Sequence, residues 1–379
     1  MKIEKRVVQV VLLLFFGWLA VYAAGMRLSV YDENGLPKKS DSVFRVAGED
    51  AAADYAAFKL METEPDKAFD PERQTAYLAE TVGTKGTFFS FASPAASFLA
   101  VPFLPMPYPQ FYATVTLWGI FCFSIAMYSI FPLIGAVLMT AALPAVFFNA
   151  VYGGTGLFVS AAVVIVLVYG GEKPKTAGVF GGLSVFSPIV FALTAAVLLF
   201  RRQKKTLAFF AGTGCCLLLA AAARYGLSVF PAALRTAFHA IENQPCRFPS
   251  VAGSYLCAGG GSFFAVLFQF FSAAVVLYGV NVLFHRRICP PEIQNAYFCA
   301  GVLLVAPFAE YGDLALFAAA AAFLLRDCEK RRYAKRDVFF FVLTGAGILL
   351  NPFVQALTGA SIFFFLNGAV LLICMRRSV

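Results

Sequence analysis

Long hydrophobic runs occupy most of the chain and are separated by short polar turns. A helix of about 20 apolar residues crosses about 30 Å of hydrocarbon. The pattern therefore predicts an all-α polytopic membrane protein, a bundle of about twelve spans of which some are short or re-entrant. The expected spans are 7–25, 88–105, 109–129, 131–150, 156–170, 177–200, 206–223, 262–284, 294–309, 313–325, 337–352 and 358–375.

Two longer polar stretches, 26–87 and 224–261, interrupt this pattern. Residues 27–86 hold 12 of the 21 acidic residues, and Lys2, Lys5 and Arg6 precede the first span. Lys and Arg that flank a span stay on the cytoplasmic side, which places both polar stretches outside. We expect one transmembrane domain over 1–379, with 26–87 as the first external (periplasmic) loop and 224–261 as the second.

Prolines break two of the expected spans. Five of them fall between Pro94 and Pro109, and Ser187-Pro188 interrupts 177–200. Broken helices at membrane depth are tolerated where they line a cavity. If four segments cross the membrane fully after the first external loop, Lys173 and Lys175 lie outside. If the proline-rich piece 94–109 is instead re-entrant, they lie inside.

Composition narrows the class of protein. The chain is 60% hydrophobic and 13% charged, with a mean hydropathy of +0.77, which excludes a soluble domain of this length. The net charge of +9 does not indicate nucleic-acid binding, because 17 of the 30 Lys and Arg lie in short clusters at the ends of spans. Such clusters contact anionic lipid headgroups on the cytoplasmic side.

The first external loop carries the first candidate for chemistry. Residues 50–60 are expected to form a helix, and Asp50 and Asp54 share one face at its start because they are four positions apart. Two interpretations stand: a solvated acidic helix with an Asp cap, or a carboxylate base that reaches a substrate hydroxyl at the membrane surface.

Two further polar interruptions are candidates. Glu310, Tyr311 and Asp313 form a turn between spans, where Asp313 either lines a pathway or only caps a helix. The turn at 153–156 contains Gly154 and Thr155. It either exposes backbone N–H groups to a phosphate or serves only as a tight connection between two spans. No Cys or His spacing suits a metal. In the second external loop, Cys246 and Cys257 are either disulfide-bonded or two thiols.

The chain resembles glycosyltransferase family 87 along nearly its whole length. The resemblance rests on the 48–50 stretch with Ala57 and Leu60, on the aromatic-Asp-Pro turn at Asp70, and on the proline-rich segment that ends at Trp118. It continues through 173–183, through 248–251, and through the late turn 307–314 with Asp313 on its last acidic position.

This resemblance implies a GT-C fold and an inverting transfer of sugar from a polyprenyl-phosphate sugar to a lipid or glycan acceptor on the outer face. It implies Asp50 as the base, with Asp54 and Asp70 supporting the loop or binding acceptor. The implied donor site comprises Gly154, Thr155, Ser187, Glu310, Tyr311, Asp313 and Arg247. No metal and no cofactor beyond the donor is implied. We expect a monomer in the bacterial cytoplasmic (inner) membrane, with membrane lipids as partners and no nucleic acid.

The chain departs from the family pattern in the donor region. Gly154-Thr155 replaces Gln-Asn, Ser187 replaces a Lys before proline, and Tyr311 replaces an acidic residue. Arg224, Arg235 and Arg247 are candidates for the missing cation. Two alternatives therefore stay open: a lipid-linked glycan flippase or transporter, and a catalytically degenerate family member.

Overall fold

The computed structural model describes residues 48–83, 89–132, 135–136, 140, 143–285, 289–331, 347–348, 350–351, 354 and 361–378. Throughout these residues the regular secondary structure is helical, as the hydrophobic pattern predicts. The expected first span, 7–25, and most of the expected span 337–352 lie outside the described residues, as does the part of the first external loop before Gly48.

The described helices follow one another along the chain with short connections. They are α2 (Glu49–Thr63), η1 (Pro65–Lys67), α3 (Pro71–Thr81), η2 (Pro94–Ala96), α4 (Ser97–Ala100), η3 (Val101–Phe103), α5 (Tyr108–Tyr128), α7 (Pro144–Tyr152), α8 (Gly156–Tyr169), α9 (Pro174–Gly182), η4 (Leu183–Phe186), α10 (Pro188–Phe200), α11 (Lys204–Tyr225), α12 (Val229–Asn243), η5 (Pro245–Arg247), α13 (Val251–Cys257), α14 (Ser262–His285), α15 (Pro291–Val305), η6 (Tyr311–Leu314), α16 (Ala315–Arg331) and α18 (Phe363–Arg377).

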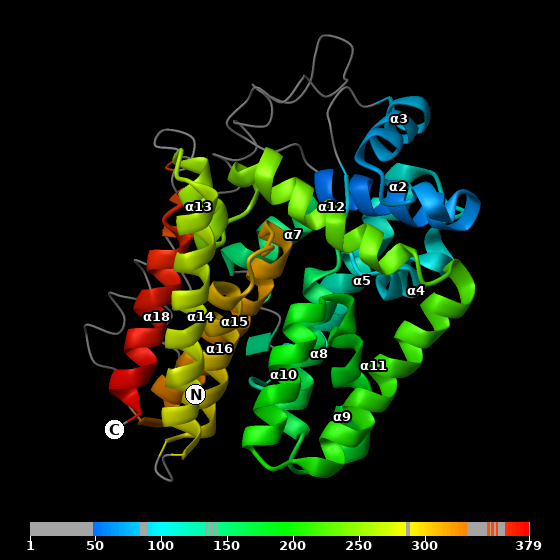
Figure 1. Cartoon of the computed structure of the whole chain (residues 1–379). Coiled ribbons are helices and arrows are strands. Elements are labelled where there is room, and N and C mark those ends of the chain that lie inside the picture. Colours follow the sequence, from blue (N-terminus) through cyan, green and yellow to red (C-terminus); the bar gives the residue numbers. More distant parts are fainter. Residues whose placement is uncertain are drawn as a thin grey trace.

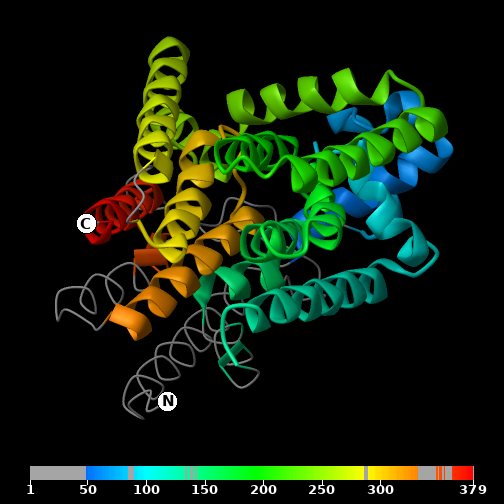
Figure 2. The same ribbon diagram turned by 90° about the horizontal axis from the view of Figure 1, so that it is seen from below.

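The long helices form two groups that stand side by side (Figures 1 and 2). One group contains α5 and α8 to α11, and the other contains α14, α15, α16 and α18. Contacts between α8 and α16 join the groups. The segments α2, α3, α12 and α13 gather at one end of both groups (Figure 1). We call this end the loop end.

Within the described residues, three helices are long and apolar enough to cross a membrane: Tyr108–Tyr128, Lys204–Tyr225 and Ser262–Phe284. Their outer faces carry large apolar side chains such as Leu219 and Phe270, which are 69% and 71% exposed. Such faces suit a hydrocarbon environment, where only helices with internally satisfied backbones are stable. These features indicate a membrane protein, but the count of twelve spans is not confirmed.

Two of the expected spans are not single helices. The described part of 88–105 forms only η2, α4 and η3, which follow one another from Pro94 to Phe103, with Pro94 at the start of η2 and Pro102 within η3. The segment 177–200 divides into α9, η4 and α10, with Pro188 at the first turn of α10. The break at Ser187-Pro188 is the one that the sequence predicts.

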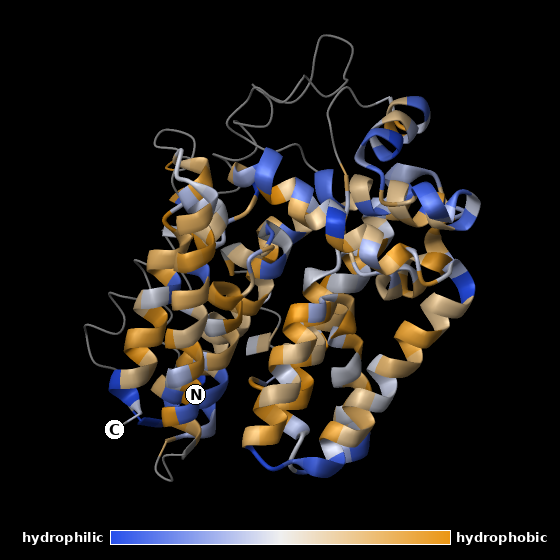
Figure 3. Cartoon of the chain, viewed as in Figure 1, coloured by the Kyte–Doolittle hydropathy of each residue, from blue (hydrophilic) through white to orange (hydrophobic). Residues whose placement is uncertain are grey.

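The turn after α8 lies beside the turn before α11. The hydroxyl of Thr206 donates a hydrogen bond of 2.5 Å to the carbonyl of Gly170, and Gly171 also lies next to Gln203. Lys173 follows directly, so it lies at the same end of the molecule as the basic cluster 201–205. Of the two topologies that the sequence leaves open, this arrangement matches the one with a re-entrant proline-rich piece. Hydrophilic ribbon marks both ends of the molecule and hydrophobic ribbon lies between them (Figure 3).

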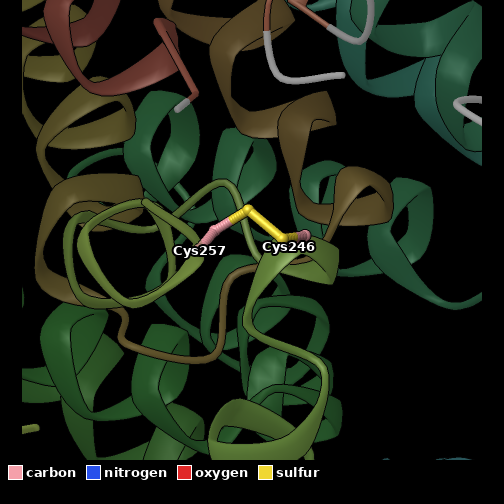
Figure 4. The surroundings of a disulfide bond; sticks show 2 residues. All are labelled: Cys246 and Cys257. Atoms are coloured by element: carbon pink, nitrogen blue, oxygen red, sulfur yellow. A yellow bond between two sulfur atoms is a disulfide. The ribbon is translucent and has the colours of Figure 1, made fainter. Parts of the chain in front are cut away.

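A disulfide fastens the polar segment 224–261. Cys246 of η5 and Cys257, the last residue of α13, are bonded (Figure 4). Their Cα atoms lie 4.8 Å apart. The bond joins the two ends of the segment that carries Arg247 and α13, and it decides between the two interpretations of these cysteines.

Candidate active site

One cavity lies at the loop end, where the two helix groups meet α2 and α12. Its volume is about 340 Å³. Four carboxylates line it: Asp50, Asp54, Glu310 and Asp313. The rest of its wall combines small polar residues with apolar ones. The lining is completed by Phe91, Ala92, Ser93, Pro94, Gly153, Gly154, Thr155, Gly156, Phe186, Ser187, Pro188, Ile189, Leu218, Phe230, Ala233, Leu234, Ala237, Ala306, Phe308 and Gly312.

The start of α2 is fixed against α5 and α7. Gly48 has a φ of 76°, and a Cβ placed there would lie 2.4 Å from the hydroxyl oxygen of Tyr108. That hydroxyl donates a hydrogen bond of 2.7 Å to the Gly48 carbonyl, while the Gly48 N–H donates to the carbonyl of Val151 at 2.7 Å. A residue with a side chain does not fit here. The glycine therefore sets the position from which Asp50 reaches the cavity.

Asp50 is paired with a buried arginine from η5. Nη2 of Arg247 lies 3.3 Å from Oδ1 of Asp50 and 2.7 Å from Oε1 of Glu310. Nη1 donates a hydrogen bond of 3.0 Å to the carbonyl of Phe89. The side chains of Arg247 and Asp50 are each 5% exposed. A buried guanidinium is tolerated when carboxylates and carbonyls surround it in this way.

Asp54 lies one turn further along α2. Its Oδ1 accepts a hydrogen bond of 2.6 Å from the hydroxyl of Ser90. Burial raises the pKa of Asp54 to about 7, although the hydrogen bond from Ser90 opposes this shift. The negative charges of Asp50 and Asp313 raise this pKa further, whereas Arg247 lowers it. Asp54 therefore changes its charge near neutral pH.

Asp313 occupies the short helix η6 on the opposite wall. Its Oδ2 accepts a hydrogen bond of 3.0 Å from the backbone N–H of Glu310, in a reciprocal cap with that residue. Burial raises the pKa of Asp313 to about 6, with the Glu310 N–H opposing the shift and the charge of Asp50 adding to it. Asp313 thus caps η6 and also faces the cavity.

The glycine turn before α8 packs tightly on η6. Gly153 and Gly154 have φ values of 83° and 91°, which favour glycine. The side-chain amide of Asn149 donates a hydrogen bond of 2.9 Å to the carbonyl of Gly312. A Cβ on Gly156 would lie 2.1 Å from the same oxygen. Small residues therefore bring the first turn of α8 against η6 at the cavity wall.

The structure brings together most of the residues that the sequence predicts for the site, in one cavity. Arg247 lies behind the carboxylates and is absent from the lining itself. Arg224 is engaged elsewhere, because its Nη2 lies 2.7 Å from Oε2 of Glu62. Asp70 does not line the cavity: its side chain accepts a hydrogen bond of 3.0 Å from the Glu72 N–H and caps α3. Tyr311 begins η6, directly after Glu310.

Several cavity residues are not identified by the sequence reasoning. The segment Phe91 to Pro94 forms one wall, and α12 forms another through Phe230, Ala233, Leu234 and Ala237. The 3.6-residue spacing of the buried residues of α12 is a signal for a packed amphipathic helix within the second external loop. The segment at Phe91 is marked only by the family resemblance, whose proline-rich block begins there.

This arrangement is suited to proton transfer and to binding hydroxyl groups. Carboxylates accept hydrogen bonds from sugar hydroxyls, and one carboxylate that is correctly placed can remove a proton. Among the residues that the structure describes, no group of three or more His, Cys, Asp or Glu side chains could hold a metal ion.

Comparisons with known proteins match residues 93–307 to glycosyltransferase family 87. No curated protein and no solved structure matches the chain. Asp50, Asp54, Glu310 and Asp313 lie outside the matched segment, whereas the glycine turn, Ser187, α12 and Arg247 lie inside it. Because the match extends over more than half of the sequence, the chain belongs to glycosyltransferase family 87.

Proposed function

We propose that this glycosyltransferase is an integral-membrane enzyme of the GT-C type that takes a sugar from a polyprenyl-phosphate donor. The acceptor is a lipid-linked or glycan hydroxyl at the outer face of the membrane. The observation that carries the proposal is the placement of Asp50 on the cavity with Arg247 at its back. A carboxylate held in this way stays fixed in orientation, as a catalytic base requires.

In this proposal Asp50 is the general base of a single displacement. The acceptor oxygen forms a bond to the anomeric carbon while the bond from that carbon to the phosphate oxygen breaks. The acceptor proton passes to Asp50, and polyprenyl phosphate leaves with the electron pair of the broken bond. Because attack and departure occur on opposite faces of the sugar, the anomeric configuration inverts. Asp54 lies beside this path and binds the acceptor.

The donor end of the cavity is assigned to the opposite wall. Gly154 and Thr155, just before the start of α8, line this wall, and N–H groups at a helix start stabilise phosphate. Glu310 and Asp313 accept hydrogen bonds from sugar hydroxyls, and Ser187 lies at the broken start of α10. The apolar side chains of Ile189, Leu218 and Leu234 suit the first prenyl units.

The outer-face location rests on two observations. Acidic residues and the Cys246–Cys257 disulfide lie at the loop end, and disulfides persist in oxidising compartments. The basic cluster 201–205, in the turn between α10 and α11, lies at the other end (Figure 1), as expected on the cytoplasmic side. We accordingly propose a monomer in the bacterial cytoplasmic membrane with its cavity open to the periplasm or exterior.

A second candidate, a catalytically degenerate member, is favoured by one observation. Among the described residues, no Lys or Arg lines the cavity, and Arg247 behind it is engaged with Asp50 and Glu310. A leaving phosphate usually needs positive charge or several N–H donors. Only the N–H groups of the glycine turn remain for this task in the present proposal.

One assay tests the proposal and separates the candidates. The full-length protein in proteoliposomes is mixed with radiolabelled polyprenyl-phosphate hexoses and a lipid extract as acceptor. We expect label to appear in a new glycolipid with wild type and not with Asp50→Asn. Absence of transfer from every donor, with an intact fold, would support the degenerate member. Movement of the unreacted donor across the bilayer would support the flippase.

A further inference from the structure

Two residues outside the cavity lining hold one of its carboxylates in place. The residues are Ser90, whose side chain and backbone are buried, and Gln74 of α3, which is fully buried. Ser90 contacts Asp54 through its hydroxyl, and Gln74 contacts Ser90 through its amide. We propose that Gln74 and Ser90 are positioning residues that fix Asp54 against bound acceptor. This inference rests on the proposed function and extends it.

The hydrogen bonds of Gln74 fix the segment that precedes η2. Its Oε1 accepts a hydrogen bond of 2.6 Å from the Ser90 N–H, and its Nε2 donates to the Ser90 carbonyl at 3.1 Å. The same Nε2 donates to the carbonyl of Ala68 at 2.7 Å. A fully buried amide is costly unless its donors and acceptors are satisfied. Here one side chain binds both backbone groups of a single residue, which fixes Ser90 relative to α3.

The hydroxyl of Ser90 connects this fixed segment to Asp54 in the cavity. It donates to Oδ1 of Asp54 at 2.6 Å and accepts from the Ala92 N–H at 2.9 Å. The donated bond leaves Oδ2 of Asp54 on the side of the glycine turn, where a Cβ on Gly154 would lie 3.9 Å from it. One oxygen of Asp54 is therefore bound by Ser90, and the other lies beside the glycine turn.

The same hydrogen bond lowers the pKa of Asp54. A hydrogen bond donated to a carboxylate favours the ionised form. The charged or titratable groups facing Asp54 within the described residues are Asp50 of its own helix, Arg247 of η5, and Glu310 and Asp313 at η6. None of these changes when Ser90 loses its hydroxyl, so a shift in the titration of Asp54 reports the Ser90 contact.

The first test is the pH dependence of transfer in proteoliposomes. We expect kcat/KM of wild type to fall as the pH drops through about 7, and the midpoint to rise by about one pH unit in Ser90→Ala. Ser90→Thr keeps a hydroxyl and restores the wild-type midpoint. Ser97→Ala is the matched control, because it removes another buried hydroxyl, one that donates to the Pro94 carbonyl at 2.7 Å.

A second test needs no transfer and so separates this inference from the proposed function. The raised pKa of Asp54 means that the native state holds a proton that the unfolded chain releases. Thermal stability in nanodiscs therefore falls as the pH rises from about 4 and levels off near 7. In Ser90→Ala the decline should extend by about one further pH unit, and in Asp54→Asn this component should vanish.

Gln74→Leu distinguishes the role of the amide. We expect faster backbone hydrogen exchange at Ser90 and the same upward shift in both pH profiles, since the serine is no longer fixed. If Ser90→Ala lowers transfer equally at all pH values with unchanged midpoints in both tests, the two residues are merely structural and the proposal is wrong. If no variant or wild type transfers sugar, the proposed function fails while the stability profiles still decide this inference.

Discussion

Nη2 of Arg247 lies 3.3 Å from Oδ1 of Asp50, although the two residues are 197 positions apart in the sequence. The pair is almost completely buried, and Glu310 completes it from a third part of the chain. The contact joins the start of α2, the end of η5 and the turn at η6 at one point. The proposed base is thus fixed by the tertiary structure rather than by its own helix alone.

Asp50→Asn should abolish sugar transfer while the protein stays folded. The amide has nearly the same shape as the carboxylate but cannot take the acceptor proton, and loss of a general base costs about 100- to 10,000-fold in rate. Initial rates with a radiolabelled donor measure the effect. Asp70→Asn is the control, because Asp70 caps α3 away from the cavity. A dead Asp54→Asn beside an active Asp50→Asn would show that the base is Asp54 instead.

Arg247→Ala should be strongly destabilising. It leaves Asp50 and Glu310 without the cation that both contact, and removing one partner of a buried ion pair costs roughly 3–5 kcal/mol. Thermal unfolding in nanodiscs measures the loss. Arg235→Ala removes an exposed arginine of the same loop and should stay within about 0.5 kcal/mol of wild type. Adding Glu310→Gln to Arg247→Ala should recover part of the loss, and no recovery would argue against the ion-pair explanation.

Transfer should decline toward acid pH in two steps. Burial raises the pKa of Asp54 to about 7 and that of Asp313 to about 6, so both carboxylates take up protons as the pH falls from 8 to 5. If ionised carboxylates bind the sugars, kcat/KM falls as the pH drops through these values. Profiles for Asp54→Asn and Asp313→Asn should each lack one step. A wild-type profile that is flat between pH 5 and 8 would contradict the assignment of both groups.

Reduction of the Cys246–Cys257 bond should destabilise the protein and reduce transfer. A bond that closes a loop of this size contributes about 2–3 kcal/mol, and Cys246 directly precedes Arg247. We expect a lower unfolding temperature for the double Cys→Ser variant, and for wild type in reductant. Reductant should have no further effect on that variant, which is the internal control. Maleimide labelling of both cysteines before reduction would show that the bond is absent.

Gly156→Ala should disturb the cavity wall. The new Cβ would lie 2.1 Å from the carbonyl oxygen of Gly312, which is backbone and cannot turn aside. Overpacking of this kind costs about 1–3 kcal/mol, so unfolding temperature and turnover should both fall. Gly212→Ala in α11 is the matched control: a Cβ there meets nothing within 4 Å, and the change should be neutral or slightly stabilising. Equal effects of the two variants would refute the close-contact argument.

The sequence predicts those features of the site that depend on local chemistry. The helix expected over 50–60, which puts Asp50 and Asp54 on one face, is confirmed by α2, and Ser187-Pro188 predicts the break before α10. Prolines and short-range spacing act through the backbone nearby, so they can be interpreted without a structure.

Other features depend on distant partners and carry no local signal. Nothing in the sequence selects Arg247 over Arg224 or Arg235, because the choice depends on which arginine lies near Asp50 after folding. The expected span 88–105, in which the sequence already predicts breaks at proline, forms only short helical pieces from Pro94 to Phe103. Its hydrophobic run is long enough for a span, but Pro94 and Pro102 lie in short turns. Hydrophobicity indicates burial or lipid contact, not an unbroken helix.

The Asp50–Arg247–Glu310 contact also sets the order of events when the protein is made. During synthesis, Asp50 leaves the ribosome long before its arginine, and Glu310 follows later still. Until α15 has been inserted and the turn after it has reached the loop end, Arg247 has only one of its two carboxylate partners. The three-residue contact can therefore form only after residue 310 has been synthesised, and a nascent chain that stops before this turn lacks one wall of the cavity.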